Sequence, residues 1–163
     1  MIYQVEGDIL RTKAQILVQS VSINDPMDRG LGLSLHNLFP IMHKEFHHWC
    51  HQHHPKPGEI WLWGKKGERQ IACLITREGF DSHDHRPGKS TLVNVNHALR
   101  ALAKLAVKEH FTSIALPKLA SGLGGLDWDE VFPLIERHLG ELAIPVFVYV
   151  DFHPGKLAQE PGL

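Results

Sequence analysis

Short apolar runs alternate along this chain with longer segments in which apolar residues recur with the period of a helix. The short runs predict β-strands, because runs of about four to eight apolar or β-branched residues between turn residues are typical of strands. The predicted strands are Ile2–Glu6, Ala14–Val21, Ile60–Trp63, Gln70–Thr76, Ser113–Leu116 and Val146–Asp151. The third and fourth flank Lys65-Lys66-Gly67, which predicts a hairpin. Ala14–Val21 is apolar enough for burial on both faces.

The longer segments predict helices. They are Leu31–His51, with an interruption at Phe39-Pro40, then Ser90–His110 and Asp129–Leu139. The second helix has an apolar stripe that consists of Leu92, Val95, Leu99 and Leu102. We expect Ser90 and Asp127 to cap the helices that follow them, because short polar side chains accept hydrogen bonds from free amides at a helix start. Strands that alternate with helices predict an α/β fold, a three-layer α/β/α sandwich around a central mixed sheet.

Composition narrows the class of protein. With 163 residues, the chain has the length of one domain with a hydrophobic core. Its formal net charge of −1 excludes bulk electrostatic attraction to nucleic acid or membranes, although it allows a local basic cleft. Cys50 and Cys73 do not suggest a disulfide framework and favour a reducing, cytoplasmic location, and the sequence shows no membrane span or signal peptide. Residues 153–163, rich in Gly, Pro and polar side chains, are expected to be loosely ordered.

Glycine-bearing loops carry the candidate binding chemistry. Ser121-Gly122-Leu123-Gly124-Gly125 lies between a predicted strand and a predicted helix, where free amides and the helix dipole favour phosphate. An ordinary strand-to-helix turn is the alternative interpretation. The spacing fits neither the Rossmann fingerprint nor the P-loop, since Gly88-Lys89-Ser90 has His83 where the P-loop needs a glycine. The loop 27–32 also follows a strand, so both loops are expected to line one crevice beyond the strand ends.

Several blocks occur in the order found in one known family. They are Gly7-Asp8-Ile9, Ile16-Leu17-Val18, Met27–Gly32, Leu74-Ile75-Thr76 and Leu116-Pro117 followed by Ser121–Trp128. Over residues 1–152 the chain therefore resembles a macrodomain, the ADP-ribose-binding α/β/α fold. Block 116–128 is most similar to the branch that contains DarG, which removes ADP-ribose from DNA bases, and the terminal ADP-ribose–protein glycohydrolase. The resemblance implies ADP-ribose or an ADP-ribosylated DNA or protein as partner, a cognate ADP-ribosyltransferase as a further partner, and no cofactor or membrane.

The same resemblance implies the ligand contacts. The Asp8 carboxylate would accept a hydrogen bond from the adenine amino group, and the backbone at Ile9 would meet the ring. Phe152 would stack on adenine. A turn aspartate and a core aromatic residue are the alternative interpretations of these side chains. Two loops would clamp the diphosphate through backbone amides, and their residues are Met27, Arg29, Gly30, Leu31, Gly32, Pro117, Ser121, Gly122, Leu123, Gly124 and Gly125.

The second predicted strand departs from the family pattern. Where this branch carries Asn-Thr-x-Asn near the distal ribose, this chain has Gln19, Ser20, Val21 and Ser22. Its polar side chains are still expected to bind the ligand, although with altered geometry. Asp28 replaces a smaller residue in the next loop, and its carboxylate opposes the diphosphate unless Arg29 or Arg77 neutralises it.

The candidate catalytic position departs as well. Arg77 stands where the hydrolase branch has a lysine after Leu-Ile-Thr. Arginine stays protonated, so it is neither an amine nucleophile nor a general base, but it can bind phosphate or stabilise negative charge. Lys89 and Lys118 are other amines, without a spacing argument for either. The loop 78–88 lies where this branch has substrate loops and offers His83, Asp84, His85 and Arg86, among which a base could be found.

A histidine stripe marks the helix predicted over residues 31–51 and its end. It consists of His43, His47, His51 and His54. Two histidines one helical turn apart can bind zinc, and Cys50 is close, but nothing completes a four-ligand set, so a solvated polar face is expected and no metal site is predicted. The adjacent face should belong to the core, and it carries Phe39, Met42, Phe46, Trp49 and Cys50.

Four functions fit these observations. The first is an ADP-ribosyl glycohydrolase, and the second is a module that binds ADP-ribose, or a related nucleotide, without turnover. The third is a phosphatase that acts on ADP-ribose 1″-phosphate. The fourth is recognition of another nucleotide or a protein partner through the altered loops.

Overall fold

A computed structural model describes residues 1–79, 88–122 and 124–163. Within these ranges the chain forms one six-stranded sheet in the order β1-β6-β5-β2-β4-β3. The strands are β1 (Ile2–Gly7), β2 (Ile16–Ser22), β3 (Ile60–Trp63), β4 (Gln70–Arg77), β5 (Ile114–Pro117) and β6 (Val146–Phe152). Neighbouring strands are parallel, except that β3 pairs with β4 as the predicted antiparallel hairpin. The prediction of a mixed sheet is therefore confirmed.

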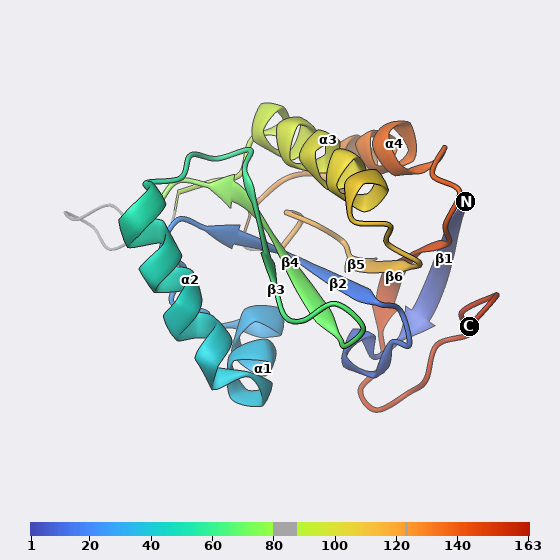
Figure 1. Cartoon of the computed structure of the whole chain (residues 1–163). Coiled ribbons are helices and arrows are strands. Elements are labelled where there is room, and N and C mark those ends of the chain that lie inside the picture. The colour runs from blue at the N-terminus through green and yellow to red at the C-terminus, as the bar shows by residue number, and fades with distance from the viewer. Residues whose placement is uncertain (80–87, 123) are drawn as a thin grey trace.

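Helices cover both faces of the sheet (Figure 1). They are α1 (Gly30–Leu38), α2 (Pro40–His53), α3 (Leu92–Lys108) and α4 (Trp128–Leu139), with a 3-10 turn, η1 (Ile9–Arg11), after β1. One apolar cluster joins α3 and α4 to the sheet, and a second joins α1 and α2 to the opposite face. Two cores on either side of one sheet make the three-layer α/β/α sandwich that the alternation of strands and helices predicted.

The predicted helix signals are mostly confirmed. The first helical segment breaks before Pro40, and Asp127 caps α4 by accepting a hydrogen bond from the Asp129 amide at 3.0 Å. The prediction that Ser90 caps α3 is wrong, because Thr91 does so, accepting from the Asn94 amide at 3.1 Å. Ser90 is buried instead, and its hydroxyl lies 2.9 Å from that of Thr76 on β4.

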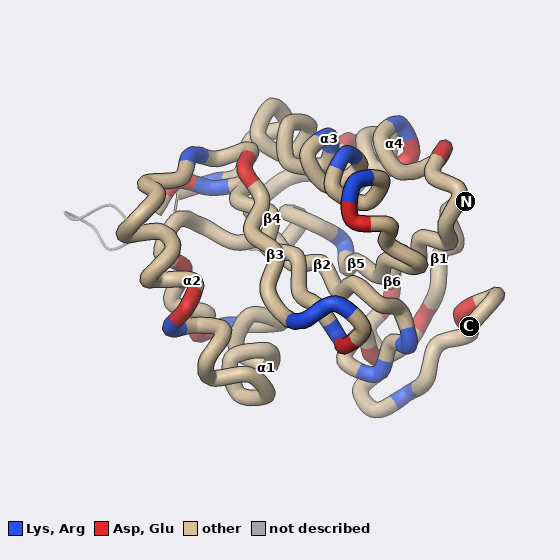
Figure 2. The backbone as a smooth tube through the Cα atoms, in the orientation of Figure 1, with Lys and Arg blue, Asp and Glu red and all other residues tan. Residues whose placement is uncertain are grey.

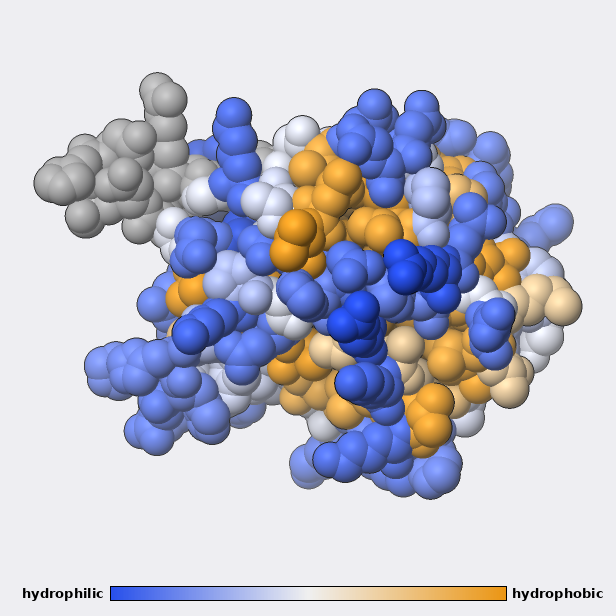
Figure 3. All heavy atoms as spheres, turned by 90° about the horizontal axis from the view of Figure 1, so that it is seen from above, coloured by the Kyte–Doolittle hydropathy of each residue, from blue (hydrophilic) through white to orange (hydrophobic). Residues whose placement is uncertain are grey.

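Charge is spread over the surface. Lys and Arg are interspersed with Asp and Glu along the backbone rather than gathered on one face (Figure 2). On the side of α3 and α4, groups of hydrophobic side chains are separated by hydrophilic ones (Figure 3). Side chains of both charge signs are therefore mixed locally, in keeping with the formal net charge of −1.

Within the described ranges, no helix combines the length and apolar character needed to cross a membrane. Cys50 and Cys73 are both buried free thiols.

The parallel strands place their carboxyl ends along one edge of the sheet. There β2 and β4 shift register, so that Ser22 pairs with Arg77 after Val21 has paired with Ile75. Such an irregularity bends a strand end and re-aims its side chains. The edge therefore brings the end of β4 and its arginine beside the loop that leads from β2 to α1.

Candidate functional site

A cleft of about 310 Å³ lies at this edge, near the lower end of the size range of small-molecule sites. The end of β2, the loop into α1, the end of β4 and the loop after β5 form its walls. Its lining residues are Gln19, Ser20, Val21, Asp25, Met27, Asp28, Arg29, Gly30, Leu31, Gly32, Arg77, Pro117, Lys118, Leu119, Ala120, Gly122 and Gly124. Ligands of open α/β sheets bind in crevices of this kind, beyond the carboxyl ends of the strands.

The start of α1 supplies backbone donors to the cleft. Arg29 is extended and no described side chain caps the helix, whose first residue, Gly30, has a φ of 52°. The amides of the first turn have no carbonyl four residues earlier within the helix, and the helix dipole adds partial positive charge there. Gly30, Leu31 and Gly32 line the cleft, so this wall is suited to an anionic group.

The opposite wall is the loop after β5, and its glycines have different roles. A Cβ on Gly124 would lie 2.5 Å from the Ala120 carbonyl oxygen and 2.7 Å from the Ser90 hydroxyl, so the close packing requires glycine. A Cβ on Gly122 would meet nothing within 4 Å. The Ser90 amide also donates to the Gly124 carbonyl at 3.2 Å. This loop is therefore fastened to the residues that lead into α3.

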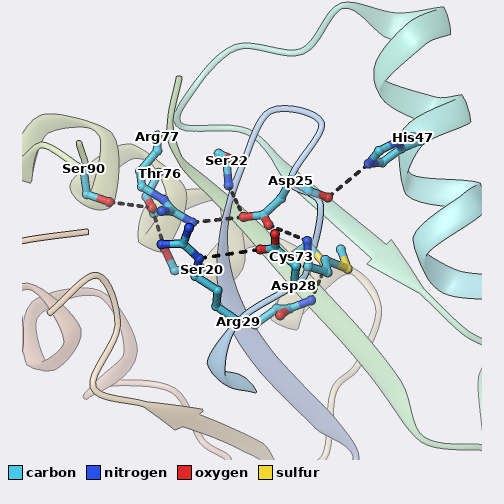
Figure 4. Close-up of polar contacts among 12 residues, drawn as sticks. Ser20, Ser22, Asp25, Asp28, Arg29, His47, Cys73, Thr76, Arg77 and Ser90 are labelled. Atoms are coloured by element: carbon cyan, nitrogen blue, oxygen red, sulfur yellow. Dashed lines mark hydrogen bonds and ion pairs between the residues drawn. The ribbon is translucent and has the colours of Figure 1, made fainter. Parts of the chain in front are cut away.

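An ion pair between Asp25 and Arg77 forms part of the cleft wall (Figure 4). The Arg77 Nη2 atom lies 2.9 Å from Asp25 Oδ2, and the two side chains are 6% and 14% exposed. The Asp25 carboxylate also accepts from the amides of Ser22 at 2.9 Å and Met27 at 2.8 Å. One carboxylate thus joins the end of β4 to the loop that enters α1, in which Met27 has a φ of 51°.

Asp25 was not among the residues predicted to form the site. Its signal was the turn pattern Asn24-Asp25-Pro26, because aspartate side chains often accept from the backbone two residues later. Arg29 or Arg77 was expected to neutralise Asp28. Arg29 Nε lies 3.9 Å from Asp28 Oδ1, whereas Arg77 pairs with Asp25. The latter two side chains are 62% and 61% exposed, so solvent weakens their interaction.

The end of β2 places two predicted ligand residues in the cleft. Gln19 Nε2 lies 3.4 Å from the Cys73 sulfur, and the Ser20 hydroxyl contacts that of Thr76. Burial raises the pKa of the Cys73 thiol to about 12, and a neutral buried thiol is a poor nucleophile. Cys73 is therefore a packing partner of Gln19 rather than a reactive group.

The structure brings most of the predicted site residues together. Those that line the cleft are Gln19, Ser20, Met27, Arg29, Gly30, Leu31, Gly32, Arg77, Pro117, Gly122 and Gly124. Those outside its lining are Asp8, Ile9, Ser22, Ser121, Gly125 and Phe152. Leu123 and the predicted loop residues His83, Asp84, His85 and Arg86 lie outside the described residues. Of the two other amines, Lys118 lines the cleft, with its Nζ 5.9 Å from the ring centre of Trp128.

The histidines behave differently along the stripe. His51 and His54 are exposed, but His43 is half-buried between His36 and His47, with ring centres 4.2 Å and 4.3 Å away. Burial lowers the pKa of His43, and the neighbouring histidines lower it further. The expectation of a fully solvated face is therefore wrong for the first half of the stripe. Among the described residues, no three potential ligands are placed to hold a metal ion.

Asp25 also connects the cleft to the packed rings of His36, His43 and His47, which we call the histidine stack. His47 Nε2 lies 3.1 Å from the Asp25 carbonyl oxygen (Figure 4). Asp25 thereby fixes the loop 22–27 in two ways. Its side chain contacts Arg77 of β4, and its backbone carbonyl contacts His47 of α2. The predicted core face of α2 is confirmed, since Met42, Phe46 and Cys50 are buried.

Comparison with known proteins agrees with this architecture. The fusion protein of Thermosipho africanus named DNA ADP-ribosyl transferase–DNA ADP-ribosyl glycohydrolase is 29% identical over 160 residues, which cover 90% of this chain and 41% of that protein. The chain thus spans about two fifths of that relative's length. The macrodomain of Thermus aquaticus DarG superposes with a TM-score of 0.79 at 28% identity, over 92% of this chain and 98% of that one.

A further solved structure, Thermosipho africanus DarTG in complex with ADP-ribose, gives a TM-score of 0.80 at 26% identity. It covers 96% of this chain and 42% of that one. The sequence model of the family described as Macro domain matches residues 24–135, more than half of the chain, which include the loop into α1, the end of β4 and the loop after β5. The chain belongs to the Macro domain family.

Proposed function

We propose that this chain binds ADP-ribose in the cleft and acts as an ADP-ribosyl glycohydrolase, which releases ADP-ribose from DNA bases or protein side chains. The uncapped start of α1, which shares the cleft with the loop after β5, carries this proposal. The comparisons support the same ligand, because one relative is named as a DNA ADP-ribosyl glycohydrolase fusion and one similar structure is a complex with ADP-ribose.

The charges of the cleft fit a diphosphate. Three cationic side chains, Arg29, Arg77 and Lys118, line it against two acidic ones, Asp25 and Asp28. Three cations against two carboxylates leave the lining with a formal net charge of +1, and this excess favours an anion. The diphosphate is expected beside the first-turn amides of α1, which places the distal ribose toward the end of β2.

Donors near the end of β2 suit a ribose. Arg77 Nε and Ser22 Oγ are buried without a hydrogen-bond partner among the described residues, and Gln19 and Ser20 line the same end of the cleft. Buried polar groups usually have partners, so an unused donor beside a cleft is available to a ligand. Ribose hydroxyls both donate and accept, and they can therefore satisfy these mixed side chains.

Hydrolysis would break the bond between the anomeric carbon of the distal ribose and the leaving base or carboxylate. The oxygen of water forms the new bond to that carbon, and the proton it loses ends on the leaving group. Arg77 stays protonated, so it does not take this proton. Its expected contribution is electrostatic, at the diphosphate or at the negative charge that develops on the leaving group.

A second candidate function is a module that binds ADP-ribose without turnover. The buried pair between Arg77 and Asp25 favours it, because the guanidinium is held by a carboxylate that itself accepts two backbone amides. Such a group is suited to holding a loop in place more than to proton transfer. The two functions share the ligand and differ in whether the bound linkage is cleaved.

Calorimetric titration tests the shared part of the proposal. We expect ADP-ribose to bind with a micromolar Kd, about 10-fold or more tighter than AMP, since AMP lacks the second phosphate and distal ribose that the cleft would hold. Equal affinity for both ligands would place the recognition outside the cleft. No binding at millimolar ADP-ribose would contradict the proposed function.

The Arg77→Lys variant separates hydrolysis from binding. If the rest of the cleft is competent, an amine at this position should raise the rate of ADP-ribose release by about 10-fold or more, because lysine can lose its proton. Arg137→Lys, which makes the same replacement at an exposed arginine of α4 outside the cleft lining, is the matched control and should leave the rate unchanged. ADP-ribosylated DNA and protein, assayed in parallel, distinguish the substrate classes.

The absence of turnover in the wild type and in Arg77→Lys, with ADP-ribose binding intact, would support the binding module. The fusion protein of Thermosipho africanus motivates a cognate ADP-ribosyltransferase as the proposed partner.

The buried free thiols of Cys50 and Cys73 fit a reducing compartment, so we propose the cytoplasm as the location.

A further inference from the structure

The segment after β6 folds back onto the other end of the same sheet edge (Figure 1). We call residues 153–163 the C-terminal strap. The His153 amide donates to the Gly7 carbonyl at 3.1 Å, and the Asp8 amide donates to the Lys156 carbonyl at 2.8 Å. A Cβ on Gly7 would lie 2.9 Å from both the Ala158 nitrogen and the Lys156 oxygen. The strap therefore packs directly on the backbone at the end of β1.

The strap also takes up the Asp8 side chain. The Gly155 amide donates to Asp8 Oδ2 at 2.8 Å, while the Leu10 amide donates to Oδ1 at 3.0 Å. Arg11 Nη1 donates to the Gly155 carbonyl at 2.6 Å, which fixes the same peptide from its other side. Asp8 is only 8% exposed as a result of this environment. A carboxylate can accept more than two hydrogen bonds, but a buried one must first be reached.

The neighbouring surface suits a flat ring. Gly7, which precedes Asp8, pairs in register with Phe152, and the Phe152 side chain is 64% exposed. An exposed aromatic ring and a carboxylate at adjacent strand ends offer stacking and an acceptor for an exocyclic amine. The Gly155 amide donates an N–H group, as that amine would, and it already occupies Asp8 Oδ2.

We propose that the C-terminal strap and an adenine ring compete for Asp8, so that the strap must release the Gly155–Asp8 hydrogen bond before ADP-ribose binds in full. This inference rests on the proposed function. The strap acts as an intramolecular inhibitor of the adenine end, while the cleft at the ends of β2, β4 and β5 stays open. Ordering of the strap lowers the apparent affinity, because only the released state is competent for the whole ligand.

A second contact anchors the strap away from Asp8. Glu160 accepts from the Lys13 amide at 2.8 Å, from the Tyr149 hydroxyl at 2.9 Å and from the Thr12 hydroxyl. Burial raises the pKa of Tyr149, so its hydroxyl remains the donor. These partners belong to neither the cleft nor the Asp8 contact. Glu160 can therefore be changed to loosen the strap without touching the residues that would bind the ligand.

Glu160→Ala in the full chain tests the competition. Loss of this anchor should tighten ADP-ribose binding by about 5- to 10-fold, the effect of one or two hydrogen bonds. Gln159→Ala, a change to an exposed neighbour with no side-chain hydrogen bond among the described residues, should leave the Kd unchanged. Equal affinity in the wild type and Glu160→Ala would overturn the inference.

Hydrogen exchange on the wild-type chain gives a test that requires no variant. The amides of Gly155 and Asp8 should lose protection when ADP-ribose is added, because both donate across the contact between the strap and β1. Binding with unchanged or increased protection would overturn the competition and leave the proposed function intact. No binding of ADP-ribose to any variant would overturn both.

Discussion

The two ends of the binding edge use the same backbone chemistry in opposite ways. At the cleft, the first-turn amides of α1 have no side-chain cap, and the cationic side chains of Arg29 and Lys118 are exposed. At the end of β1, the amides and the Asp8 carboxylate are bonded to the C-terminal strap. Both ends lie at carboxyl termini of parallel strands, so strand direction alone does not make a site. A strand end becomes available only where its polar groups have no partner within the chain.

The ion pairs in the loop into α1 show the same contrast. The Asp25–Arg77 pair is buried, whereas the Asp28–Arg29 pair is exposed to solvent and its atoms are 3.9 Å apart. A buried charge whose partner is removed is strongly destabilising, while an exposed pair contributes little. The buried pair therefore determines the shape of the cleft, and the exposed pair adjusts its charge.

The largest expected effect comes from Asp25→Ala. This change leaves the Arg77 guanidinium buried without its carboxylate and removes the acceptor for two loop amides, so it should lower the free energy of unfolding by about 3 kcal/mol. Asp28→Ala should change it by less than about 0.5 kcal/mol. Urea denaturation of both variants makes the measurement, and equal losses would remove the distinction between the two pairs.

A smaller loss is expected at the wall after β5. Gly124→Ala forces a methyl group against the Ala120 carbonyl and the Ser90 hydroxyl, which should lower the free energy of unfolding by about 1–3 kcal/mol and weaken ADP-ribose binding. Gly122→Ala places its methyl group in open space and should leave stability unchanged to within about 0.5 kcal/mol. Thermal unfolding compares the two. Similar melting temperatures would show that the packing around position 124 does not require glycine.

The smallest effect concerns pH. The pKa of His43 is lowered by burial and by His47 and His36, although Asp25 and the Pro26 carbonyl oppose this shift. The unfolded chain therefore binds more protons as the pH falls through about 6.5, so this histidine makes stability decrease on acidification. His43→Gln should flatten the dependence of the unfolding free energy on pH between about 7.5 and 5.5.

The His43→Gln variant is expected to keep part of this pH dependence. Burial, followed by Arg100 and Arg137, lowers the pKa of His138 on α4, which contributes with the same sign. His51→Gln is the control, because His51 is exposed on the same helix as His43. An identical slope in the wild type and His43→Gln would show that the histidine stack does not resist protonation.

Sequence reasoning recovered the elements because their signals are local. The stripe of Val95, Leu99 and Leu102 repeats with the period of a helix, and these residues are fully buried in α3. The cap of α4 and the break before Pro40 also depend on nearest neighbours along the chain. The cap of α3 was misplaced by one residue, because the sheet and the loop after β5 bond Ser90 instead.

The sequence by itself determined the α/β/α layers, the two glycine-bearing loops and most residues of the cleft. The tertiary structure decided the partners of the charged groups. Arg77 meets Asp25 across 52 positions of sequence, and Gly155 meets Asp8 across 147. Periodicity and spacing report which face a residue presents, but not which distant residue packs against that face. For this chain, that choice separates the open cleft from the strand end that its own C-terminal strap covers.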